Sequence, residues 1–557
     1  MKKLILTLTL IFSLIHYSKA DAKSDEFDVY LMIGQSNMAG RGEFEACDTM
    51  EYAEGVYLLD SEGKPTNAIS PFNRYSTIRK ELSLQGYSPA NKFSELMHSR
   101  SGRKILIVSN ARGGSSIDHW LPGDRHDFLG EAVRRTRQAM HYGTLKGIVW
   151  HQGETNIQKG LTGYIEKFTA MITALRDSLG VGEVPVVIGQ VGQWKWAPTE
   201  DIMAFNDSVV PNIAEKVANC KYVSSNGLAR RYRDKESDPH FGRKAQMELG
   251  RRYADAMVLL TDSIFITEFK DGKRGAVSFT FDDGDLDHYL LVAPELEKRG
   301  FRGTFWISGD KINKGDSVRP RMTWPQLREM ADRGHEISNH SFTHAKLVQM
   351  SPEEVRRDIE MNDSAIVRNV GKRPVTFCYP FNGYPDWLVK IAEEGRVGSR
   401  THQTGIGQQN NKSTREKLCS WTDNVIKNGE WGVTMIHGIT TGYDKWYEPQ
   451  KLWDFFDYVK ANNSDLWVAP FCDVAEYRKL RDNINLSVVK AEDRIEIHTA
   501  SPLDTSLFSS KVTIALKGEW NKKQVKAIRD GKAVSTSIKD DLLLLDMYPS
   551  DKVTIMF

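Results

Sequence analysis

The stretch VYLMIGQSNMAG, residues 29–40, decides the fold of the N-terminal part of the chain. Its first five residues are apolar and favour a buried strand, whereas small and polar residues follow Gly34. Four further apolar runs come after it, separated by amphipathic helical stretches, at residues 105–108, 147–150, 184–188 and 221–223. Strands that alternate with helices predict a parallel sheet covered by helices on both faces. We therefore expect an α/β domain over residues 28–266.

Ser36 directly follows the first of these strands, at the edge where open α/β sheets bind ligands. A serine nucleophile needs a general base and hydrogen-bond donors for the oxyanion. Paired glycines in NARGGSS (110–116), amides in WHQGETN (150–156) and a histidine in SDPHF (237–241) supply these groups. A serine–asparagine pair that only caps a helix is the alternative. The four blocks together favour a serine esterase.

These blocks, in this order, resemble those of the SGNH hydrolases, most closely the sialate O-acetylesterase-like branch that includes the acetylxylan esterases of carbohydrate esterase family six. The resemblance covers about residues 28–257 and implies a three-layer α/β/α, flavodoxin-like fold. It implies that Ser36 is the nucleophile and His240 the general base. The oxyanion would be held by the backbone N–H groups of Ser36 and Gly114 and by Gln152. This site would need no cofactor.

The acid that orients His240 departs from the pattern of the wider family. That family carries an aspartate three residues before the histidine, and this position is Ser237 here. We expect Glu154 of the HQGE block to orient the imidazole instead, which gives a Ser-His-Glu site. Asp238 is the alternative, although an aspartate before Pro239 is also typical of a turn.

A second alternating block begins with AVSFTFDDGD, residues 276–285. Six further strand candidates follow at residues 303–307, 336–338, 374–377, 397–400, 433–436 and 466–469, with helices between them. Seven repeats of strand and helix predict a (β/α)7-type barrel over residues 274–480. The tail, residues 486–557, has short alternating runs that predict a small antiparallel β domain. We expect a structural cap there, with a carbohydrate-binding module as the alternative.

Acids and histidines follow two of the barrel strands. Asp282 and Asp283 come directly after the first strand, and HSFTH (340–344) follows the strand at 336–338. Two imidazoles and one carboxylate leave coordination sites open for water, which suits a catalytic zinc. Such a metal lowers the pKa of water and polarises an acyl oxygen, so a second carboxylate can act as base. A solvated turn and a polar pair are the alternatives, but their joint placement favours a metal site.

TFDDG together with HSFTH resembles the first two motifs of the polysaccharide deacetylases, the NodB-homology family or carbohydrate esterase family four. The resemblance spans about residues 275–477. It implies that a divalent metal, zinc, is bound by three ligands, namely Asp283, His340 and His344. It also implies that Asp282 is the general base. MIHG (435–438) is similar to the motif that supplies a general-acid histidine, here His437.

The third deacetylase motif departs from the family. Relatives often carry an arginine there that orients the base, whereas FCYPF, residues 377–381, places Cys378 at the matching position. This departure weakens the expected tuning of the base more than it weakens metal binding.

Composition and the N-terminus define the class of protein. The chain has 75 basic and 73 acidic residues and no sustained basic run, so nothing indicates nucleic-acid binding. Its five cysteines lack CxxC spacing, which indicates neither a disulfide framework nor a thiolate zinc site. Residues 1–20 carry two lysines, an apolar run and the small-x-small signal Ser18-Lys19-Ala20, which predict a cleaved signal peptide rather than the alternative membrane anchor. We expect a protein that is secreted or periplasmic.

The sequence therefore predicts an exported bifunctional carbohydrate esterase that removes acetyl groups from a polysaccharide, with acetylated xylan as the first expectation. The first domain would use Ser-His-Glu chemistry and the second a metal that activates water. One alternative is N-deacetylation of chitin-like or peptidoglycan-like glycans by the second domain. Another is a carbohydrate-binding protein with a degenerate site.

Overall fold

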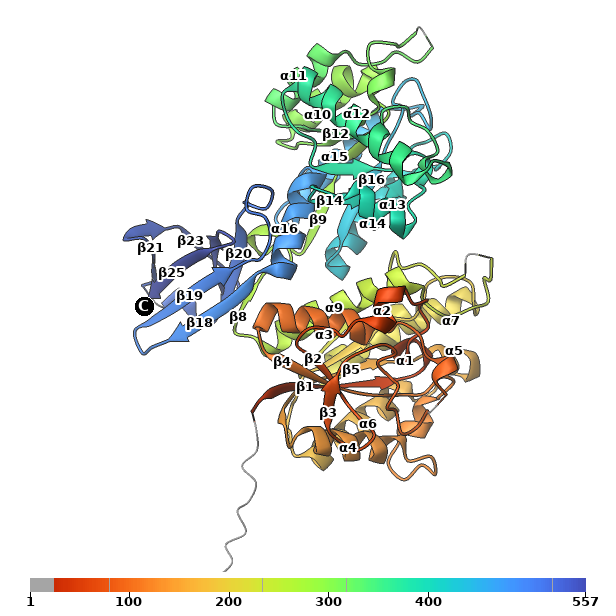
Figure 1. Ribbon diagram of the computed structural model, residues 1–557, viewed down its shortest axis with the longest axis vertical. Coiled ribbons are helices and arrows are strands. Elements are labelled where there is room, and N and C mark those ends of the chain that lie inside the picture. Colours follow the sequence, from red (N-terminus) through yellow and green to blue (C-terminus); the bar gives the residue numbers. More distant parts are fainter. Residues whose placement is uncertain (1–24, 80, 233, 317, 523) are drawn as a thin grey trace, which may run out of the picture.

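The computed structural model describes residues 25–557 with the exception of 80, 233, 317 and 523. The expected signal peptide, residues 1–20, lies outside the described residues. An N-terminal region with one large sheet is followed by a central region with two parallel sheets and a C-terminal region with two antiparallel sheets (Figure 1). In the described part of the chain, no helix is both long and apolar enough to cross a membrane.

A seven-stranded sheet forms the middle layer of the N-terminal region, in the order β3-β2-β4-β1-β5-β6-β7. Its strands are β1 (Phe27–Gly34), β2 (Val56–Leu59), β3 (Pro65–Asn67), β4 (Lys104–Ala111), β5 (Gly143–His151), β6 (Val186–Gly189) and β7 (Cys220–Val223). All run parallel to their neighbours except β3, which is antiparallel to β2. Gly34 at the end of β1 pairs with Ala111 and with His151, so three central strands end at one level.

Helices cover both faces of this sheet (Figure 1). They are α3 (Pro89–Ser101) and α9 (Arg243–Thr261) on one face, and α4 (Phe128–Ala139), α6 (Tyr164–Leu179) and α8 (Val210–Lys216) on the other. Tyr30 and Met32 of β1 pack with the first pair, while Val29, Leu31 and Ile33 pack with the other three. Because successive side chains point to opposite faces, a strand buried on both sides must be apolar throughout. The predicted three-layer arrangement is confirmed.

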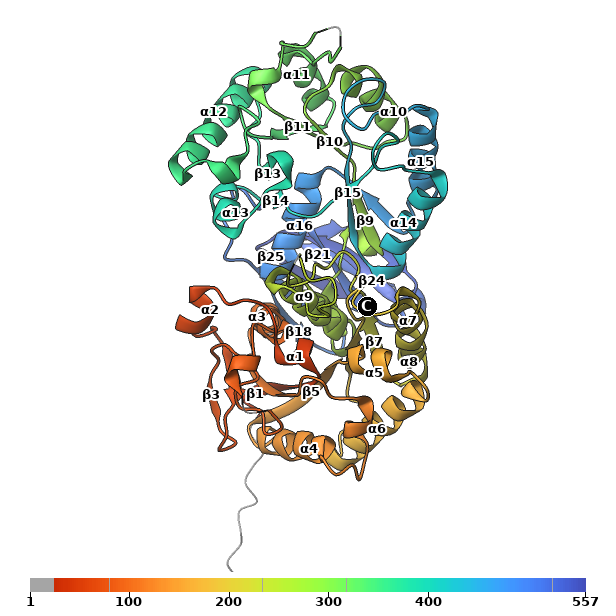
Figure 2. The same cartoon turned by 90° about the vertical axis from the view of Figure 1, so that its right-hand side faces the viewer.

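The central region holds two parallel sheets whose strands lie around a ring (Figure 2). The sheet orders are β10-β11-β12-β13-β14 and β15-β16-β9-β17. The strands are β9 (Gly275–Ser278), β10 (Thr280–Asp282), β11 (Thr304–Ile307), β12 (Glu336–Asn339), β13 (Thr376–Cys378), β14 (Gly398–Arg400), β15 (Thr404–Gly405), β16 (Trp431–Met435) and β17 (Leu466–Val468). A bridge between Phe281 and Ile436 links the two sheets. Since no pairing between described strands joins β14 to β15, a closed (β/α)7 barrel stays a prediction.

Helices surround this ring (Figure 2). They are α10 (Ala293–Lys298), α11 (Trp324–Asp332), α12 (Pro352–Val370), α13 (Asp386–Ala392), α14 (Arg415–Asn428) and α15 (Gln450–Ala461). The predicted first strand is interrupted at Phe279, so that β9 pairs with β16 and β17 while β10 pairs with β11. In both sheets the strands are parallel, so their carboxyl ends lie at the same end of the ring.

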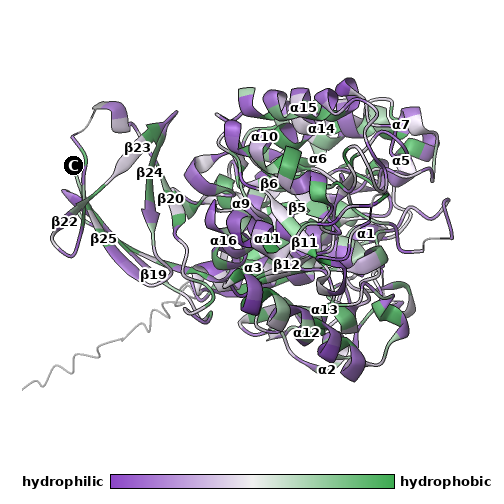
Figure 3. Cartoon of the chain, turned by 90° about the horizontal axis from the view of Figure 1, so that it is seen from above, coloured by the Kyte–Doolittle hydropathy of each residue, from purple (hydrophilic) through white to green (hydrophobic). Residues whose placement is uncertain are grey.

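The C-terminal region consists of two antiparallel sheets, ordered β18-β19-β25-β21-β22 and β23-β24-β20-β8. The strands are β8 (Ile264–Ile266), β18 (Asn485–Lys490), β19 (Arg494–Ala500), β20 (Val512–Lys517), β21 (Lys526–Arg529), β22 (Lys532–Val534), β23 (Thr536–Lys539), β24 (Leu542–Met547) and β25 (Asp551–Met556). We expected residues 264–266 in the first domain, whereas β8 pairs with β20 of this region. The C-terminal region lies on the side of the molecule opposite to α1 (Ser36–Ala39), as Figures 1 and 3 both show.

Candidate active sites

Ser36 is the first residue of α1, two residues after β1 ends at Gly34. Its Oγ lies 3.0 Å from Nε2 of His240. On the other side of the ring, Nδ1 of His240 lies 2.5 Å from Oδ1 of Asp238. The same carboxylate oxygen accepts the backbone N–H of His240 at 3.1 Å, and the indole of Trp194 donates to the Asp238 carbonyl at 2.6 Å. A hydroxyl, an imidazole and a carboxylate thus form one continuous chain, the arrangement of a serine hydrolase.

The orienting acid is therefore Asp238 in this geometry, and the expectation for Glu154 is corrected. Glu154 is buried at the start of a short helix, and its Oε1 accepts a 2.5 Å hydrogen bond from Nδ2 of Asn37. Asn37 also donates to the carbonyl of Pro239 at 3.2 Å and accepts the N–H of Phe241 at 3.1 Å. Glu154 therefore holds the Asn37 amide, and Asn37 in turn hydrogen-bonds the backbone on both sides of His240. The carboxylate thus positions the histidine loop rather than the imidazole itself.

The electrostatics keep these groups in their useful protonation states. Burial raises the pKa of Glu154, but the nearby His151 and the Asn37 amide outweigh it and lower that pKa, which favours the carboxylate form. Burial is the main reason that the pKa of His240 lies below its ordinary value. The Asp238 carboxylate opposes this shift and the Arg41 guanidinium reinforces it. The neutral imidazole, the form that accepts a proton, is thus favoured.

Two backbone N–H groups are available to an oxyanion. Among the described residues, neither Ser36 nor Gly114 donates its N–H to an acceptor. Gly114 has φ +74°, and the space that a Cβ would fill is open. Both observations agree with the predicted donor pair, since a developing negative charge requires donors that are not already committed.

Gln152 does not fit its predicted role as the third donor. Its Nε2 lies 3.0 Å from Oε1 of Gln35, 3.1 Å from the Ser115 carbonyl and 2.8 Å from Oδ1 of Asn156. Two amide hydrogens already have three acceptors, so none is left for substrate. The amide nearest the nucleophile is that of Gln35, whose Nε2 lies 3.5 Å from Ser36 Oγ. Gln35 directly precedes Ser36 in the sequence, and this position is the signal that could have identified it as a residue beside the nucleophile.

Arg41 is a second residue that the motifs did not identify. Its Nη2 and the Cβ of Ser36 lie 2.7 Å and 3.4 Å from the position that a Cβ of Gly113 would take. A side chain at residue 113 would therefore have to displace the Arg41 guanidinium from this space. Burial, reinforced by the charges of Arg79 and Arg231, lowers the pKa of Arg41 to about 10.

The central region brings together the three predicted metal ligands. Nε2 of His344 lies 2.9 Å and Nε2 of His340 lies 3.6 Å from Oδ1 of Asp283. This oxygen accepts no hydrogen bond from the described residues although it is buried. Asp283, Ser341 and His344 all have positive φ, at 77°, 66° and 57°. Non-glycine residues in that region carry backbone strain, which is typical of functional sites.

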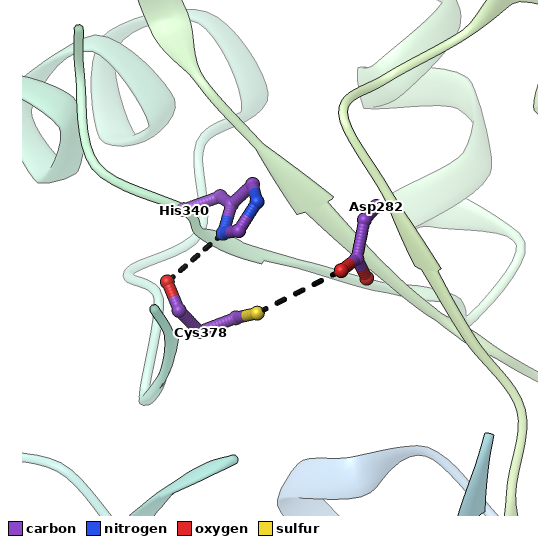
Figure 4. A group of neighbouring side chains, drawn as sticks. All are labelled: Asp282, His340 and Cys378. Atoms are coloured by element: carbon purple, nitrogen blue, oxygen red, sulfur yellow. Dashed lines mark hydrogen bonds between the residues drawn. The ribbon is translucent and has the colours of Figure 1, made fainter. Parts of the chain in front are cut away.

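A second group of side chains, Asp282, His340 and Cys378, also lies close enough to surround an ion (Figure 4). Burial raises the pKa of the Cys378 thiol well above its ordinary value, so the thiolate that metals require is disfavoured. Asp282 has both oxygens engaged by an arginine. The donor set that fits a divalent metal is therefore Asp283, His340 and His344, with Nδ1 of His340 fixed 2.9 Å from the Cys378 carbonyl.

Arg400 replaces the arginine that the third motif lacks. It lies at the end of β14 and binds Asp282 with both nitrogens, Nη1 to Oδ1 at 2.7 Å and Nη2 to Oδ2 at 2.5 Å. Both side chains are buried, with exposed fractions of 0% and 3%. Burial raises the pKa of Asp282, but the charges of Arg400 and of nearby histidines outweigh it and lower that pKa. A charged residue at the carboxyl end of a predicted strand was the available signal.

His437 and Arg319 complete the surroundings of the two aspartates. Nε2 of His437 lies 3.8 Å from Oδ2 of Asp282, so the predicted acid and base are adjacent. Arg319, from the connection between β11 and α11, donates from Nη2 to Oδ2 of Asp283 at 2.7 Å. This contact orients the carboxylate and leaves Oδ1 facing the two histidines. Sequence reasoning missed Arg319, because it lies in a long connection without a motif.

Comparisons with known proteins agree with this pair of sites. Residues 26–259 match the family described as carbohydrate esterase, sialic acid-specific acetylesterase, and residues 269–397 match polysaccharide deacetylase. A probable carbohydrate esterase of Arabidopsis thaliana is 24% identical over 249 residues, 41% of this chain and 89% of its own length. Its crystal structure covers 42% of this chain and 99% of that one, with 20% identity and a TM-score of 0.37.

Two Bacillus subtilis proteins are similar to part of the chain, the putative polysaccharide deacetylase YxkH and the deacetylase PdaA. YxkH is 25% identical over 155 residues, 28% of this chain and 52% of its own length. The peptidoglycan-N-acetylmuramic acid deacetylase PdaA is 24% identical over 172 residues, 30% of this chain and 62% of its own length. The chain thus spans about half to three-fifths of these relatives. Deacetylases of this kind are generally metal-dependent, in agreement with the candidate triad.

Proposed function

We propose that the chain is a hydrolase that removes acetyl groups from polysaccharides, and that both of its sites act on acetylated xylan. The support is the match of residues 26–259 to the sialic acid-specific acetylesterase type of carbohydrate esterase and of residues 269–397 to polysaccharide deacetylase. The observation that carries the proposal is the continuous chain from Ser36 through His240 to Asp238. Xylan is supported by the resemblance of both regions to families that include acetylxylan esterases. We propose export to the periplasm or the medium, as the N-terminal residues predict.

At the esterase site, His240 takes the proton of Ser36 while the serine oxygen attacks the acetyl carbonyl carbon. The N–H groups of Ser36 and Gly114 stabilise the resulting oxyanion. His240 then returns the proton to the sugar oxygen, which leaves as a hydroxyl, and the acetyl group remains as an ester on the serine. Water, deprotonated by the same imidazole, cleaves that ester and releases acetate.

At the deacetylase site, Asp283, His340 and His344 would hold a divalent metal, for which we propose zinc. When bound, the metal polarises the acetyl oxygen and makes water a better nucleophile. Asp282 accepts the proton of the attacking water, and Arg400 holds this carboxylate in place. His437 donates a proton to the departing sugar oxygen. The products are acetate and a free sugar hydroxyl.

Acetate release from acetylated xylan by the full-length chain tests the proposal. A serine-directed organophosphate should remove the part of the activity that Ser36→Ala removes, and a chelator should remove the part that Asp282→Asn removes. The combined variant should be inactive. The proposal is wrong if the unmodified, zinc-loaded chain releases no acetate, or if a chelator leaves the Ser36→Ala chain fully active.

N-deacetylation by the central region is a second candidate, favoured by the similarity to PdaA, which is named as a peptidoglycan deacetylase. The Ser36→Ala chain isolates this site. Acetate release from peptidoglycan or chitin oligomers that exceeds release from acetylated xylan would favour amide over ester substrates. The reverse ranking would favour the xylan proposal.

A further inference from the structure

The long helix α9 lies between the N-terminal and central regions (Figure 1). It runs antiparallel to the strands beneath it, because Tyr253 bonds His151 at the end of β5 whereas Met257 lies against Gly147, nearer the start of that strand. The first turn of α9 is thus at the catalytic edge, three residues beyond His240. Contacts made by the first turn of α9 therefore lie near the catalytic edge, and contacts made by later turns lie farther from it.

The first turn of α9 contacts the carboxyl end of the ring. Nζ of Lys244 lies 2.6 Å from Oδ1 of Asp386 and donates to the Tyr384 carbonyl at 3.1 Å. Tyr384 and Asp386 belong to the segment that leaves β13. A second ion pair, 3.6 Å long, joins Lys390 of α13 to Glu45, which precedes α2 (Ala46–Met50).

Farther along, α9 contacts the opposite end of the ring. Nη1 of Arg252 lies 3.6 Å from Glu430, and Nδ2 of Asn226 donates to the same carboxylate at 2.9 Å. Glu430 directly precedes β16, so it marks the end of the ring where strands begin. The first turn of α9 lies at the catalytic edge of the sheet and contacts the carboxyl end of the ring, whereas a later turn contacts the opposite end. The catalytic edge of the sheet and the carboxyl end of the ring therefore face the same side of the molecule. Figure 2 looks onto that side, with the sheet below the ring.

Exposed aromatic rings adjoin the two ion pairs that join the regions. Phe44 adjoins Glu45 and Trp387 adjoins Asp386, and each is 37% exposed. Phe381 is 61% exposed, and its ring centroid lies 5.0 Å from that of His344. The charges of these ion pairs are matched, since Lys244 and Lys390 each meet a carboxylate and Arg243 lies 3.3 Å from Glu45 and 2.8 Å from Asp48. Such a surface suits an uncharged sugar polymer, whose C–H faces pack on aromatic rings, better than a polyanion.

We propose that this surface, the bridge of Phe44, Trp387 and the two ion pairs, holds one acetylated glycan chain across both active sites. The inference rests on the proposed function, since it assigns the same polymer to the two sites. A single bound chain then presents acetyl groups to Ser36 and to the metal ligands without being released. The bridge acts on binding of a long chain and not on the chemistry of either site.

The full-length, zinc-loaded chain tests this with two substrates, acetylated xylan polymer and p-nitrophenyl acetate. Ser36→Ala isolates the metal site and Asp282→Asn isolates the serine site. Into each background we would introduce Phe44→Ala with Trp387→Ala. The ratio of polymer to small-ester kcat/KM should fall at least fivefold at both sites. Tyr548→Ala removes a comparably exposed ring, 45% accessible, from the C-terminal region and should leave both ratios unchanged.

The outcomes are distinct. A ratio that falls at one site only, or at neither, overturns the shared chain, and so does an equal fall with Tyr548→Ala. A bridge variant that changes the oligomeric state in sedimentation while the ratios stay unchanged would assign the surface to a second copy of the chain. Lack of activity on both substrates before any bridge substitution would instead refute the proposed function.

Discussion

The two candidate sites differ in where the partner of the general base comes from. At the esterase site Asp238 lies two residues before His240, and one short turn sets their geometry. At the deacetylase site the partner of Asp282 is Arg400, 118 positions away on another strand. A local pair depends on its loop, whereas a distant pair depends on the folding of the whole ring. Substitutions at the two sites should therefore differ in whether zinc content or folding is lost together with activity.

The largest effect is expected for the nucleophile. Ser36→Ala should lower kcat of the serine site by about 10⁴-fold or more, because the nucleophile and its base act as a unit. The full-length variant should keep its zinc content and its activity at the metal site. Single-site assays with a chelator present would measure this, and residual activity above one-tenth would show that another residue attacks the ester.

Next in size is the separation of the adjacent aspartates. Asp283→Ala should lose bound zinc and activity together, because it removes a ligand oxygen. Asp282→Asn should keep zinc and lose turnover by about 10²–10⁴-fold, the usual contribution of a general base. Metal analysis beside acetate release would decide. Full zinc content in the Asp283 variant, or none in the Asp282 variant, would mean that the two roles are exchanged.

The orienting acid gives a third contrast. Asp238→Asn should cost far more than Glu154→Gln, about 10²–10⁴-fold against about tenfold, because only Asp238 bonds the imidazole. Glutamine at residue 154 can still hydrogen-bond Asn37. Initial rates of the serine site, with melting temperature as a control for folding, would rank the two. Equal losses would show that Asn37 and Glu154 position His240 as strongly as the carboxylate does.

The distant pair gives a smaller effect. Arg400→Lys keeps the charge but loses the paired contact with both oxygens of Asp282, so kcat at the metal site should fall about 10–100-fold, by analogy with other misplaced catalytic groups. Zinc content should be unchanged. Cys378→Ser is the matched control at the position where relatives carry arginine. A variant at residue 400 with normal kcat would show that Asp282 needs no such support.

These contrasts mark how far the sequence alone predicts the molecule. Residues that come directly after a strand were predictable, as Ser36, Asp283 and His340 show, because parallel strands end at one edge. The choice between Glu154 and Asp238 was not, because it depends on which way two side chains point from different elements. Arg400 ends a predicted strand and Arg319 lies in a connection without a motif, and in neither case does the surrounding sequence state which carboxylate the guanidinium contacts.

The strands, too, divide into those that the sequence predicted and those that it did not. Long apolar runs such as residues 29–33 and 105–108 predicted β1 and β4, because burial on both faces demands an unbroken apolar sequence. No strand was predicted at residues 264–266, which were placed at the end of the first domain, whereas β8 pairs with a strand of the C-terminal region. Three apolar residues after a helix are compatible with either neighbour, and only pairing with β20, far along the chain, decides between them.

The smallest effect expected is a shift of the pH profile at the serine site, and its sign is opposite for the two charges beside His240. The acid limb of kcat/KM reports the free imidazole, which must be neutral to accept the proton of Ser36. Arg41 lowers the pKa of His240, so Arg41→Met should move the limb to higher pH. Asp238 raises that pKa, so the residual activity of Asp238→Asn should have its limb at lower pH.

Arg231→Met is the control, because that guanidinium pairs with Glu43 at 2.9 Å and should leave the limb in place. Profiles measured at constant ionic strength with a chelator present would show the shifts, and a limb that moves the same way in both variants would mean that a group other than His240 titrates.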